Sequence, residues 1–393
     1  MIDSQLVDKI GKLDSSIDRE LLHALGESAR GLLVADLSSI AEAARKPSVD
    51  REMWKTYASL DWLGLVVPER LGGSGAGLTA AAVVAQSMGY AGRSDPYVAA
   101  GVITPLWLSA VTEHTAATAL LNRVMAGGTV VVPAWQSVRG ELDLDTGDLP
   151  TLVGDSAAAV LDGAVHWVPT HEADHYLVVA VAPDGLELVV VAADSAGVVR
   201  RPLQMGDGTT WAHLRFDAVE VRACDRFRLG SVERRALERG VDAGVLTSAA
   251  ELLGLINRAF EATVSYLRER EQFGRPIGTY QVLQHKAVDM WVQRELACAA
   301  LADAHAQTHG APDHARLPTL ASSAKARAGQ AALFVGNQAI QLHGAIGFTE
   351  EYGLGHLVNR SLVLSAWLGN NRVHRQRFRN LVRAAEPIDT GIS

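Results

Sequence analysis

The sequence predicts an α+β fold, mostly α, that is divided into three domains. A helical domain is expected over residues 1–128, a small β-barrel or sandwich over 129–233, and a four-helix bundle over 234–393. Three observations support this prediction: helical spacing of apolar residues at the start, short β-branched runs in the middle, and helical spacing again to the end. A chain of 393 residues is long enough for two or three domains with full cores.

The composition indicates a soluble globular protein and excludes several functional classes. Hydrophobic residues make up 48% of the chain and charged residues 20%, unlike the composition of disordered proteins. The formal net charge of −8 argues against a general nucleic-acid binder, which needs a basic surface. Two cysteines are too few for a disulfide framework or a cysteine zinc site. No signal peptide or membrane span is recognisable, so we expect a cytoplasmic protein that does not bind membranes.

In the first domain, helices are expected at 18–45, 51–60 and 78–88, where apolar residues recur at helical spacing. A loop with Pro68 and several glycines precedes the third helix. Those glycines lack the G-x-G-x-x-G spacing, and no strand leads directly into them, so the loop is not interpreted as a nucleotide-binding loop.

In the middle domain, strands are expected at TVVVPAW, YLVVAVA, LELVVVAA and WAHLRFDAVEV, with a PDG turn between the second and third. Residues 171–175, HEADH, match the H-E-x-x-H zinc motif, which needs a helix to place both histidines on one face. Pro169 upstream and a strand-like run downstream predict a polar surface turn instead. We therefore expect no metal site here.

The C-terminal domain is expected to contain four helices, at 238–272, 281–308, 316–343 and 350–383. Glycine- and proline-containing stretches at 310–312 and 343–347 predict the breaks around the third helix.

The connection between the first two of these helices, within residues 266–290, contains side chains that suit a large, flat, anionic ligand. Gly274 permits close backbone approach, and Pro276 fixes φ and removes a donor. The polar and aromatic residues around this turn are Arg270, Gln272, Phe273, Tyr280, Gln281, Gln284 and His285. An ordinary helix–turn–helix with solvated charges is the alternative interpretation.

The order R-x-x-F-G-x-P-I-G-x-x-Q-x-x-Q-H over 270–285 closely resembles a signature of the acyl-CoA dehydrogenase family of flavoenzymes. The segment QAIQLHGAIGFTEEYGLGHLVNR at 338–360 resembles the family's Q-x-H-G-G-x-G-F-T motif, and WKTYASLDWLGLVVPERLGGSG resembles its N-terminal helical domain. The resemblance covers roughly residues 50–380. It implies the acyl-CoA dehydrogenase fold, FAD as cofactor and an acyl-CoA thioester as substrate.

The resemblance assigns FAD contacts residue by residue. Six residues match positions that hold the pyrophosphate and adenosine, usually of the neighbouring subunit's flavin. They are Arg270, Gln272, Phe273, Ile277, Tyr280 and Gln281. Those in the second motif are Gln341, Leu342, Gly344 and Ala345, the last replacing a usual glycine. An arginine offers charge-assisted hydrogen bonds to a pyrophosphate, and glycine amides at helix ends bind anions. A ligand between chains implies a homo- or hetero-oligomer, a dimer or a tetramer.

The middle domain departs from the family pattern. Members usually carry a T-E-P-G-x-G-S-D-like loop that touches the flavin and the acyl-CoA, whereas residues 133–148 are PAWQSVRGELDLDTGD. Trp167 matches the family tryptophan beside the flavin, and Pro169 stands where a threonine often occurs. Trp167 is therefore the flavin contact that the resemblance keeps in this domain.

The family reaction is α,β-dehydrogenation, in which a glutamate removes the α-proton while the β-hydrogen leaves as hydride to the flavin. The usual position of that glutamate falls on Leu368, and an alternative position used by some members falls on Gly244. Neither residue accepts a proton, so we expect no catalytic base at either position. Asn370 and Arg372 replace the small hydroxyl and the glutamine that usually meet the flavin. Nearby carboxylates that are poor substitutes are Asp242, Glu251, Glu350 and Glu351.

These departures leave several functions open. The first is the base-lacking subunit of a hetero-oligomeric acyl-CoA dehydrogenase, paired with a glutamate-bearing relative. The second is a self-sufficient flavin oxidase or monooxygenase on the same scaffold. The third is a non-catalytic assembly partner, and an ordinary homo-oligomeric dehydrogenase with a relocated base is the fourth. The sequence does not indicate the acyl chain length, or whether the acyl group is a fatty acid or a steroid.

Overall fold

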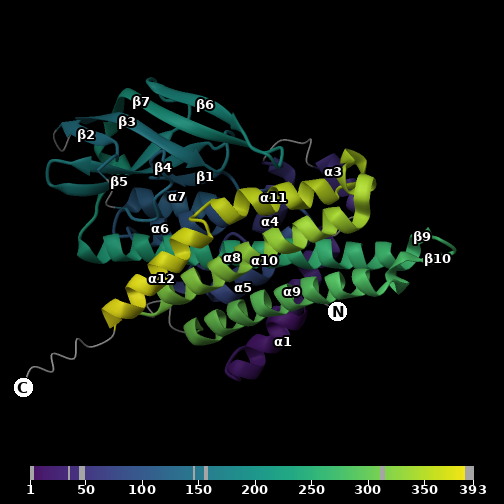
Figure 1. The fold of residues 1–393 in the computed structure, drawn as a ribbon. Helices are drawn as coiled ribbons and strands as arrows, with labels where there is room; N and C mark the ends of the chain where they lie inside the picture. Colours follow the sequence, from purple (N-terminus) through teal and green to yellow (C-terminus); the bar gives the residue numbers. More distant parts are fainter. Residues whose placement is uncertain are drawn as a thin grey trace, which may run out of the picture.

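The computed structural model describes residues 4–33, 36–43, 49–144, 147–154, 158–309 and 315–385. Helices form most of the molecule, and a β-sheet lies at one end of it (Figure 1). A short hairpin projects from the opposite end of the long helices (Figure 1). The mostly helical α+β class that the sequence predicts is therefore confirmed.

The first part of the chain is helical, as expected. Its elements are α1 (Ser4–Leu13), α2 (Arg19–Leu33), α3 (Leu37–Ala43), α4 (Arg51–Ser59), η1 (Glu69–Leu71), α5 (Gly77–Tyr90), η2 (Tyr97–Ile103), α6 (Thr104–Ser109) and α7 (Thr115–Met125). Helix α4 begins at an N-cap, because Asp50 Oδ1 accepts a hydrogen bond from the Met53 amide at 3.1 Å. The helical stretch expected over 18–45 forms the two helices α2 and α3, and residues 34, 35, 44 and 45 lie outside the described part.

Eight strands form one sheet over residues 131–228. They are β1 (Val131–Ala134), β2 (Thr151–Gly154), β3 (Ala158–Val168), β4 (His175–Ala182), β5 (Gly185–Ala192), β6 (Val198–Gln204), β7 (Thr210–Arg222) and β8 (Arg226–Arg228). Seven strands follow the order β6-β7-β3-β2-β4-β5-β8, and β1 pairs with β4 in parallel. Because β6 and β8 are not paired with each other, the described strands form an open sheet rather than a closed barrel. The domain boundaries at 128 and 233 stay a prediction.

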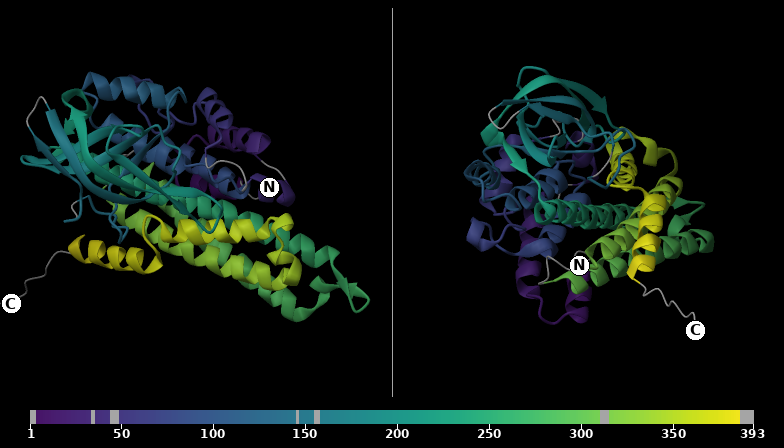
Figure 2. Two further views of the ribbon diagram at one scale, coloured as in Figure 1. Left: turned by 90° about the horizontal axis from the view of Figure 1, so that it is seen from above. Right: turned by 90° about the vertical axis from the view of Figure 1, so that its left-hand side faces the viewer.

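The last part of the chain is the helical bundle. Its elements are α8 (Ser231–Glu269), β9 (Glu271–Gln272), β10 (Arg275–Pro276), η4 (Ile277–Thr279), α9 (Gln281–Thr308), α10 (Leu317–His343), η5 (Gly344–Phe348), η6 (Glu350–Tyr352), α11 (Leu354–Ala366) and α12 (Asn371–Ala385). Figure 2 shows α8 between the N-terminal helices on one side and α9 and α10 on the other. The predicted break at 310–312 lies outside the described residues.

The prediction of one helix over 350–383 is wrong. This segment contains the turn η6 and two helices, α11 and α12, joined by residues 367–370. In that link Leu368 has φ +54° and Gly369 has φ +90°. A right-handed helix cannot continue through two left-handed residues, so the chain changes direction there. The first helix of the bundle also begins seven residues earlier than expected, at Ser231.

Two glycines let the buried helix α5 lie directly against α8. A Cβ atom on Gly89 would lie 2.0 Å from the backbone oxygen of Glu251, and one on Gly254 would lie 2.0 Å from the backbone oxygen of Gln86. Residues 79–89 of α5 are all buried, and six of them are alanine or valine. This close backbone contact fixes the middle of α8, which carries Gly244 and Glu251.

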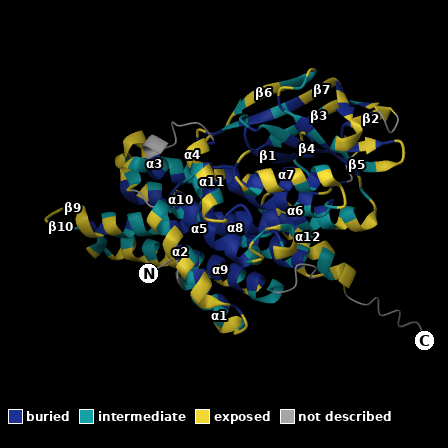
Figure 3. Ribbon diagram, turned by 180° about the vertical axis from the view of Figure 1, so that it is seen from behind, coloured by how far each residue is buried: buried dark blue, intermediate teal, exposed yellow. Residues whose placement is uncertain are grey.

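The core follows α5, α8, α10 and the sheet, where buried residues predominate (Figure 3). The hairpin of β9 and β10 and the ends of the bundle are mainly exposed (Figure 3). Charged side chains are also buried in the core, among them Glu251, Lys325 and Arg360. None of the helices in the described part is long and apolar enough to cross a membrane.

The HEADH segment forms a turn that leads into β4, as predicted. Glu172 accepts a hydrogen bond from the Val49 amide at 2.9 Å, and Asp174 pairs with Arg51 at 2.7 Å. These carboxylates therefore attach the N-terminal helices to the sheet. Within the described ranges, no group of three or more histidine, cysteine, aspartate or glutamate side chains is arranged to hold a metal ion.

Candidate functional site

The connection between α8 and α9 is a small hairpin that extends beyond the bundle. Helix α8 ends at Glu269, and β9 and β10 pair antiparallel through Gln272 and Arg275. The tip adopts left-handed backbone at Phe273 (φ +55°) and Gly274 (φ +79°). This turn leaves the Phe273 ring 91% exposed. An aromatic ring presented to solvent in this way is a common feature of binding surfaces.

The hairpin and the C-terminal end of α10 enclose a groove of about 730 Å³, here called the hairpin groove. The predicted cofactor residues that line it are Arg270, Gln272, Phe273, Ile277, Tyr280, Gln341, Leu342, Gly344 and Ala345. The two sequence motifs, about sixty residues apart, thus meet at one place. Gln281 is not among the lining residues, although it begins α9 beside the groove.

Two lining residues, Tyr266 and His343, were missed as functional residues in the sequence. Their rings stack with centroids 4.5 Å apart, and the centroid of the Tyr352 ring lies 5.2 Å from that of His343. His343 Nδ1 lies 2.8 Å from the Ala339 carbonyl, so Nδ1 carries the proton and Nε2 accepts from the Tyr352 hydroxyl at 3.2 Å. Burial lowers the pKa of His343, which favours this neutral form. The presence of both residues within the two motifs was the available signal.

Polar groups of the groove are positioned by the hairpin itself. The Arg275 guanidinium lies 4.2 Å from the centroid of the Tyr280 ring, and the Tyr280 hydroxyl donates to the Gln272 carbonyl at 3.3 Å. These contacts hold Tyr280 and Gln272, which line the groove together with Arg270. Arg270 is exposed, at the end of α8.

The groove can accept the pyrophosphate and adenosine of a dinucleotide. Gly344 has φ +65°, and a Cβ placed on it would meet no atom within 4 Å, so the backbone at the end of α10 is open to a ligand. Arg270 supplies a planar cationic donor suited to a pyrophosphate. Lys286 on α9 adds a second positive charge to the lining. The aromatic surfaces of Phe273 and Tyr280 suit the flat adenine.

Gly244 and Leu368 lie side by side in the core, although they are 124 residues apart in the sequence. A Cβ on Gly244 would lie 3.5 Å from Leu368 Cδ1 and 2.5 Å from Ile103 Cδ1. Leu368 is 1% exposed. A position on α8 and a position in the α11–α12 link therefore lie at the same spot, and the nearest side-chain atoms there are apolar.

The nearest buried carboxylates on α8 are paired with arginines. Asp242 accepts a hydrogen bond from Arg377 of α12. Glu251 accepts from Arg360 at 2.7 and 3.0 Å, and Arg360 also donates to Asp207 at 3.0 Å. Burial raises the pKa values of Asp242 and Glu251, while their arginine partners oppose that shift.

Glu350 and Glu351 lie in the turn η6, exposed and outside the bundle core. Of the four carboxylates that the sequence suggested, two are therefore paired with arginines and two are exposed.

Trp167 and Asn370 lie outside the hairpin groove. Trp167 has φ +56°, and its Nε1 donates to the Val138 carbonyl at 3.1 Å, which ties the tryptophan to the altered 133–148 loop. Residues 145 and 146 of that loop lie outside the described part. Asn370 caps α12, because its Oδ1 accepts from the backbone amides of Arg372 and Val373.

Lys325 is a third residue that sequence reasoning missed. Its Nζ donates to the carbonyls of Leu364 and Trp367 at 2.6 and 2.8 Å, and to Ser248 Oγ at 3.0 Å. It therefore holds the end of α11 in the position that leads to Leu368. A lysine in an alanine- and serine-rich helix carries no sequence signal for this role.

Both helical parts of the chain match known family models. The acyl-CoA dehydrogenase N-terminal domain matches residues 19–125, and the acyl-CoA dehydrogenase C-terminal domain matches residues 235–380. The chain belongs to the acyl-CoA dehydrogenase family. Members are FAD-dependent flavoprotein oxidoreductases of fatty-acid metabolism.

Individual acyl-CoA dehydrogenases are similar over most of the chain. Acyl-CoA dehydrogenase IpdE2 of Mycobacterium tuberculosis is 29% identical over 322 residues, which cover 80% of this chain and 81% of that protein. A variant of the Tcur3481–Tcur3483 steroid ACAD has a TM-score of 0.77 and 29% identity, and covers 93% of this chain and 98% of its own. A glutaryl-CoA dehydrogenase from Mycobacterium smegmatis in complex with FADH2 shares the fold, with a TM-score of 0.80, 18% identity and coverage of 93% and 94%.

Proposed function

We propose that this chain is the base-lacking subunit of a hetero-oligomeric acyl-CoA dehydrogenase. In this assembly a glutamate-bearing relative removes the α-proton, and this chain helps to hold the FAD on which the pair depends. The observation that carries the proposal is the convergence of Gly244 and Leu368 on one apolar spot. Both positions at which the family resemblance expects a base contribute to that spot, and neither supplies a carboxylate.

The hairpin groove is the part of the chain that would hold the cofactor. Arg270 would pair with the pyrophosphate, the open backbone at Gly344 would approach it, and Gln341 would add a polar contact. FAD, when bound, supplies the acceptor for the hydride that leaves the β-carbon of the acyl group. The tip residue Phe273 extends past the bundle, where a neighbouring subunit would complete the site.

Loss of the base has a predictable kinetic consequence. General-base catalysis contributes about 10²–10⁴ in rate, so the chain alone is expected to form enoyl-CoA very slowly. The paired carboxylates do not offer a replacement. Moving Glu251 toward Gly244 would leave Arg360 without one of its two buried partners.

The comparison with the Tcur3481–Tcur3483 steroid ACAD supports an assembly of unlike chains. That dehydrogenase is named for two proteins, Tcur3481 and Tcur3483, and its matched chain is 29% identical to this chain. By analogy, the substrate of the assembly is an acyl-CoA thioester with a bulky acyl group.

The test is co-expression of this chain with a glutamate-bearing relative, followed by co-purification, flavin absorbance and an enoyl-CoA formation assay. We expect a stable complex with bound FAD and rapid turnover, and at least about 100-fold slower turnover from this chain alone. In the complex, Arg270→Gln should lower the flavin content. Arg268→Gln, in the last turn of α8, does not line the groove and serves as the matched control.

Three results would contradict the proposal. Fast enoyl-CoA formation by the chain alone would show that a base exists elsewhere. Rapid oxygen- or NADH-dependent turnover without a partner would assign an oxidase or monooxygenase. A complex that carries no FAD at any interface would leave only the role of a non-catalytic assembly partner.

A further inference from the structure

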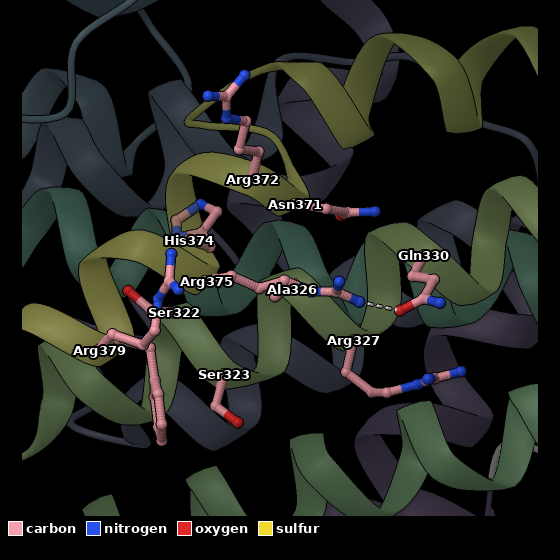
Figure 4. A pocket seen from close by; sticks show the side chains of 11 residues that line it. Ser322, Ser323, Ala326, Arg327, Gln330, Asn371, Arg372, His374, Arg375 and Arg379 are labelled. Carbon is pink, nitrogen blue, oxygen red and sulfur yellow. Dashed lines mark hydrogen bonds between the residues drawn. The ribbon is translucent and has the colours of Figure 1, made fainter. Parts of the chain in front are cut away.

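A second groove lies between α10 and α12, away from the hairpin (Figure 4). Its volume is about 750 Å³, within the range of small-molecule sites. It is lined by Arg327 of α10 and by Arg372, Arg375 and Arg379 of α12, and is called the arginine groove below. No aspartate or glutamate is among its described lining residues.

The four guanidinium groups of this groove are not neutralised by carboxylates within the described chain. Arg327 donates to the Gln293 side chain, Arg375 to Gln330 and Arg379 to Gln376, so each of these three bonds ends on a neutral amide oxygen. Burial lowers the pKa of Arg327, and the positive charge of Arg375 lowers it further. Like charges gathered on two helices without a counter-charge favour binding of a multivalent anion.

A buried histidine in the same groove provides an independent observation. His374 is 0% exposed, and its Nε2 lies 2.7 Å from the Leu368 carbonyl, so Nε2 carries the proton. Its Nδ1 is buried and has no hydrogen-bond partner. Burial and the charge of Lys325 lower the pKa of His374 to about 3, so Nδ1 is an unused acceptor at neutral pH. A buried acceptor without a partner costs free energy, so a ligand donor that reached Nδ1 would be favoured.

We propose that the arginine groove binds a nucleotide with a terminal phosphate, a ligand that combines several negative charges with a hydroxyl donor. The guanidinium groups would take the phosphates, His374 Nδ1 would accept from a sugar hydroxyl, and Phe378 on the same wall would contact the base. The inference does not depend on the proposed dehydrogenase function, because it uses none of the residues of the hairpin groove.

The charge count favours a terminal phosphate over the internal pyrophosphate of a flavin dinucleotide. An internal pyrophosphate carries about two negative charges and would leave half of the four guanidinium groups unpaired. A terminal phosphate adds about 1.5 to 2 negative charges at pH 7. Free nucleoside diphosphates and the phosphorylated adenosine of coenzyme A both meet this requirement.

The experiment is isothermal titration calorimetry of the full chain carrying Arg270→Gln, because Arg270 of the hairpin groove is itself suited to a pyrophosphate. The probes are ADP, coenzyme A, pyrophosphate and FAD, and each further substitution is made in this background. We expect saturable binding of ADP or coenzyme A with one site per chain, and the tighter of the two identifies the source of the nucleotide. The double variant Arg375→Gln/Arg379→Gln should bind at least about ten-fold more weakly. Arg383→Gln, on α12 but outside the groove, is the matched control and should bind like the parent protein.

A second variant tests the histidine separately from the charge. His374→Gln keeps a donor near the Leu368 carbonyl but removes the acceptor at Nδ1. It should weaken binding of ADP several-fold and leave binding of pyrophosphate unchanged, because pyrophosphate has no sugar hydroxyl. Equal weakening of both probes would contradict the assigned role of His374.

Absence of saturable binding by ADP and coenzyme A would overturn the proposal. Arg383→Gln would also overturn it if it weakened nucleotide binding as much as the double arginine variant does. Tighter binding of FAD than of either nucleotide, lost in the double arginine variant, would also overturn it and assign the groove to the flavin. Because Arg270→Gln already weakens the hairpin groove, the binding that remains reports on the arginine groove, so failure of this inference and failure of the dehydrogenase proposal give different results.

Discussion

At the scale of single residues, substitution of Arg360 is expected to lower the free energy of unfolding strongly. Arg360 is 4% exposed, and its guanidinium donates hydrogen bonds to both Glu251 and Asp207. Replacing Arg360 with methionine leaves two buried carboxylates without a cation. We expect Arg360→Met to lower the free energy of unfolding by about 3–5 kcal/mol, measured by urea denaturation at pH 7.

The control for this variant is Arg51→Met. Arg51 pairs with Asp174 at the surface, where its side chain is 44% exposed, and surface ion pairs contribute about 1 kcal/mol or less. If Arg360→Met cost no more than Arg51→Met, the buried cluster would not stabilise the bundle in the way that its geometry indicates.

Acid sensitivity is expected from buried neutral histidines. Burial lowers the pKa of His305 to about 3, whereas the pKa of histidine in the unfolded chain is near its ordinary value of 6.5. Below pH 6.5 the unfolded chain binds the proton more readily, so stability falls as the pH decreases from about 6.5 toward 3. Between pH 7 and pH 5 this one residue should cost about 2 kcal/mol.

The variant His305→Leu should show a correspondingly smaller loss between pH 7 and pH 5, measured from urea midpoints. Leu301→Ala on the same helix, also fully buried, serves as control because it destabilises without adding or removing a titratable group. An equal acid-induced loss in His305→Leu and in the parent protein would exclude His305 as a source of the pH dependence.

Single residues also mark the limit of the sequence analysis. Arg270, Gly274 and the 338–360 motif were recognisable because their chemistry is grouped within a few residues. The contact between Gly244 and Leu368 was not, since it depends on how α8 meets the α11–α12 link. The partners of Arg360 were hidden for the same reason, because Asp207 and Glu251 come from the middle part of the chain and from α8.

At the scale of elements, the α5–α8 crossing depends on glycine. A Cβ on Gly254 would lie 2.0 Å from a backbone oxygen of α5, so Gly254→Ala forces the two helices apart. We expect a loss of about 1–3 kcal/mol or more in the free energy of unfolding. The measurement is thermal and urea unfolding followed by circular dichroism.

Gly31→Ala on α2 is the matched control, because a Cβ there would meet no atom within 4 Å. It should stabilise the protein by about 0.5–1 kcal/mol through helix propensity alone. A stabilising Gly254→Ala would contradict the close packing of α5 against α8.

The long helices and four of the eight sheet strands were predictable from periodicity, but the link at 367–370 was not. Apolar spacing continues through this segment, and Gly369 was the one local signal of an interruption. The left-handed Leu368 is held by distant partners, since Lys325 binds the preceding carbonyl and His374 binds the carbonyl of Leu368. Tertiary contacts of this kind override local helix propensity.

At the scale of the whole molecule, one face of α9 indicates how chains assemble. Four apolar side chains on it are exposed at helical spacing: Val288, Trp291, Val292 and Leu296. A contiguous apolar stripe on a protein surface usually marks an interface. We expect Trp291→Glu to shift the protein toward smaller species in size-exclusion chromatography with light scattering.

Leu21→Glu on α2 provides the comparison, because Leu21 is 49% exposed and lies on a different helix. It should leave the oligomeric state unchanged. If both variants dissociated to the same extent, the effect would reflect added charge and not the α9 stripe.

The length of α8 has a consequence for how motion spreads through the protein. At 1.5 Å per residue, its 39 residues form a rod of about 58 Å that begins beside the sheet and ends at the hairpin. Its central turns pack against α5 and α10, so their amide hydrogens should exchange with deuterated solvent only when the entire bundle opens. The last turns, by contrast, can fray and re-form freely. A molecule captured at the hairpin would therefore slow exchange first at that tip and leave the clamped centre as it was.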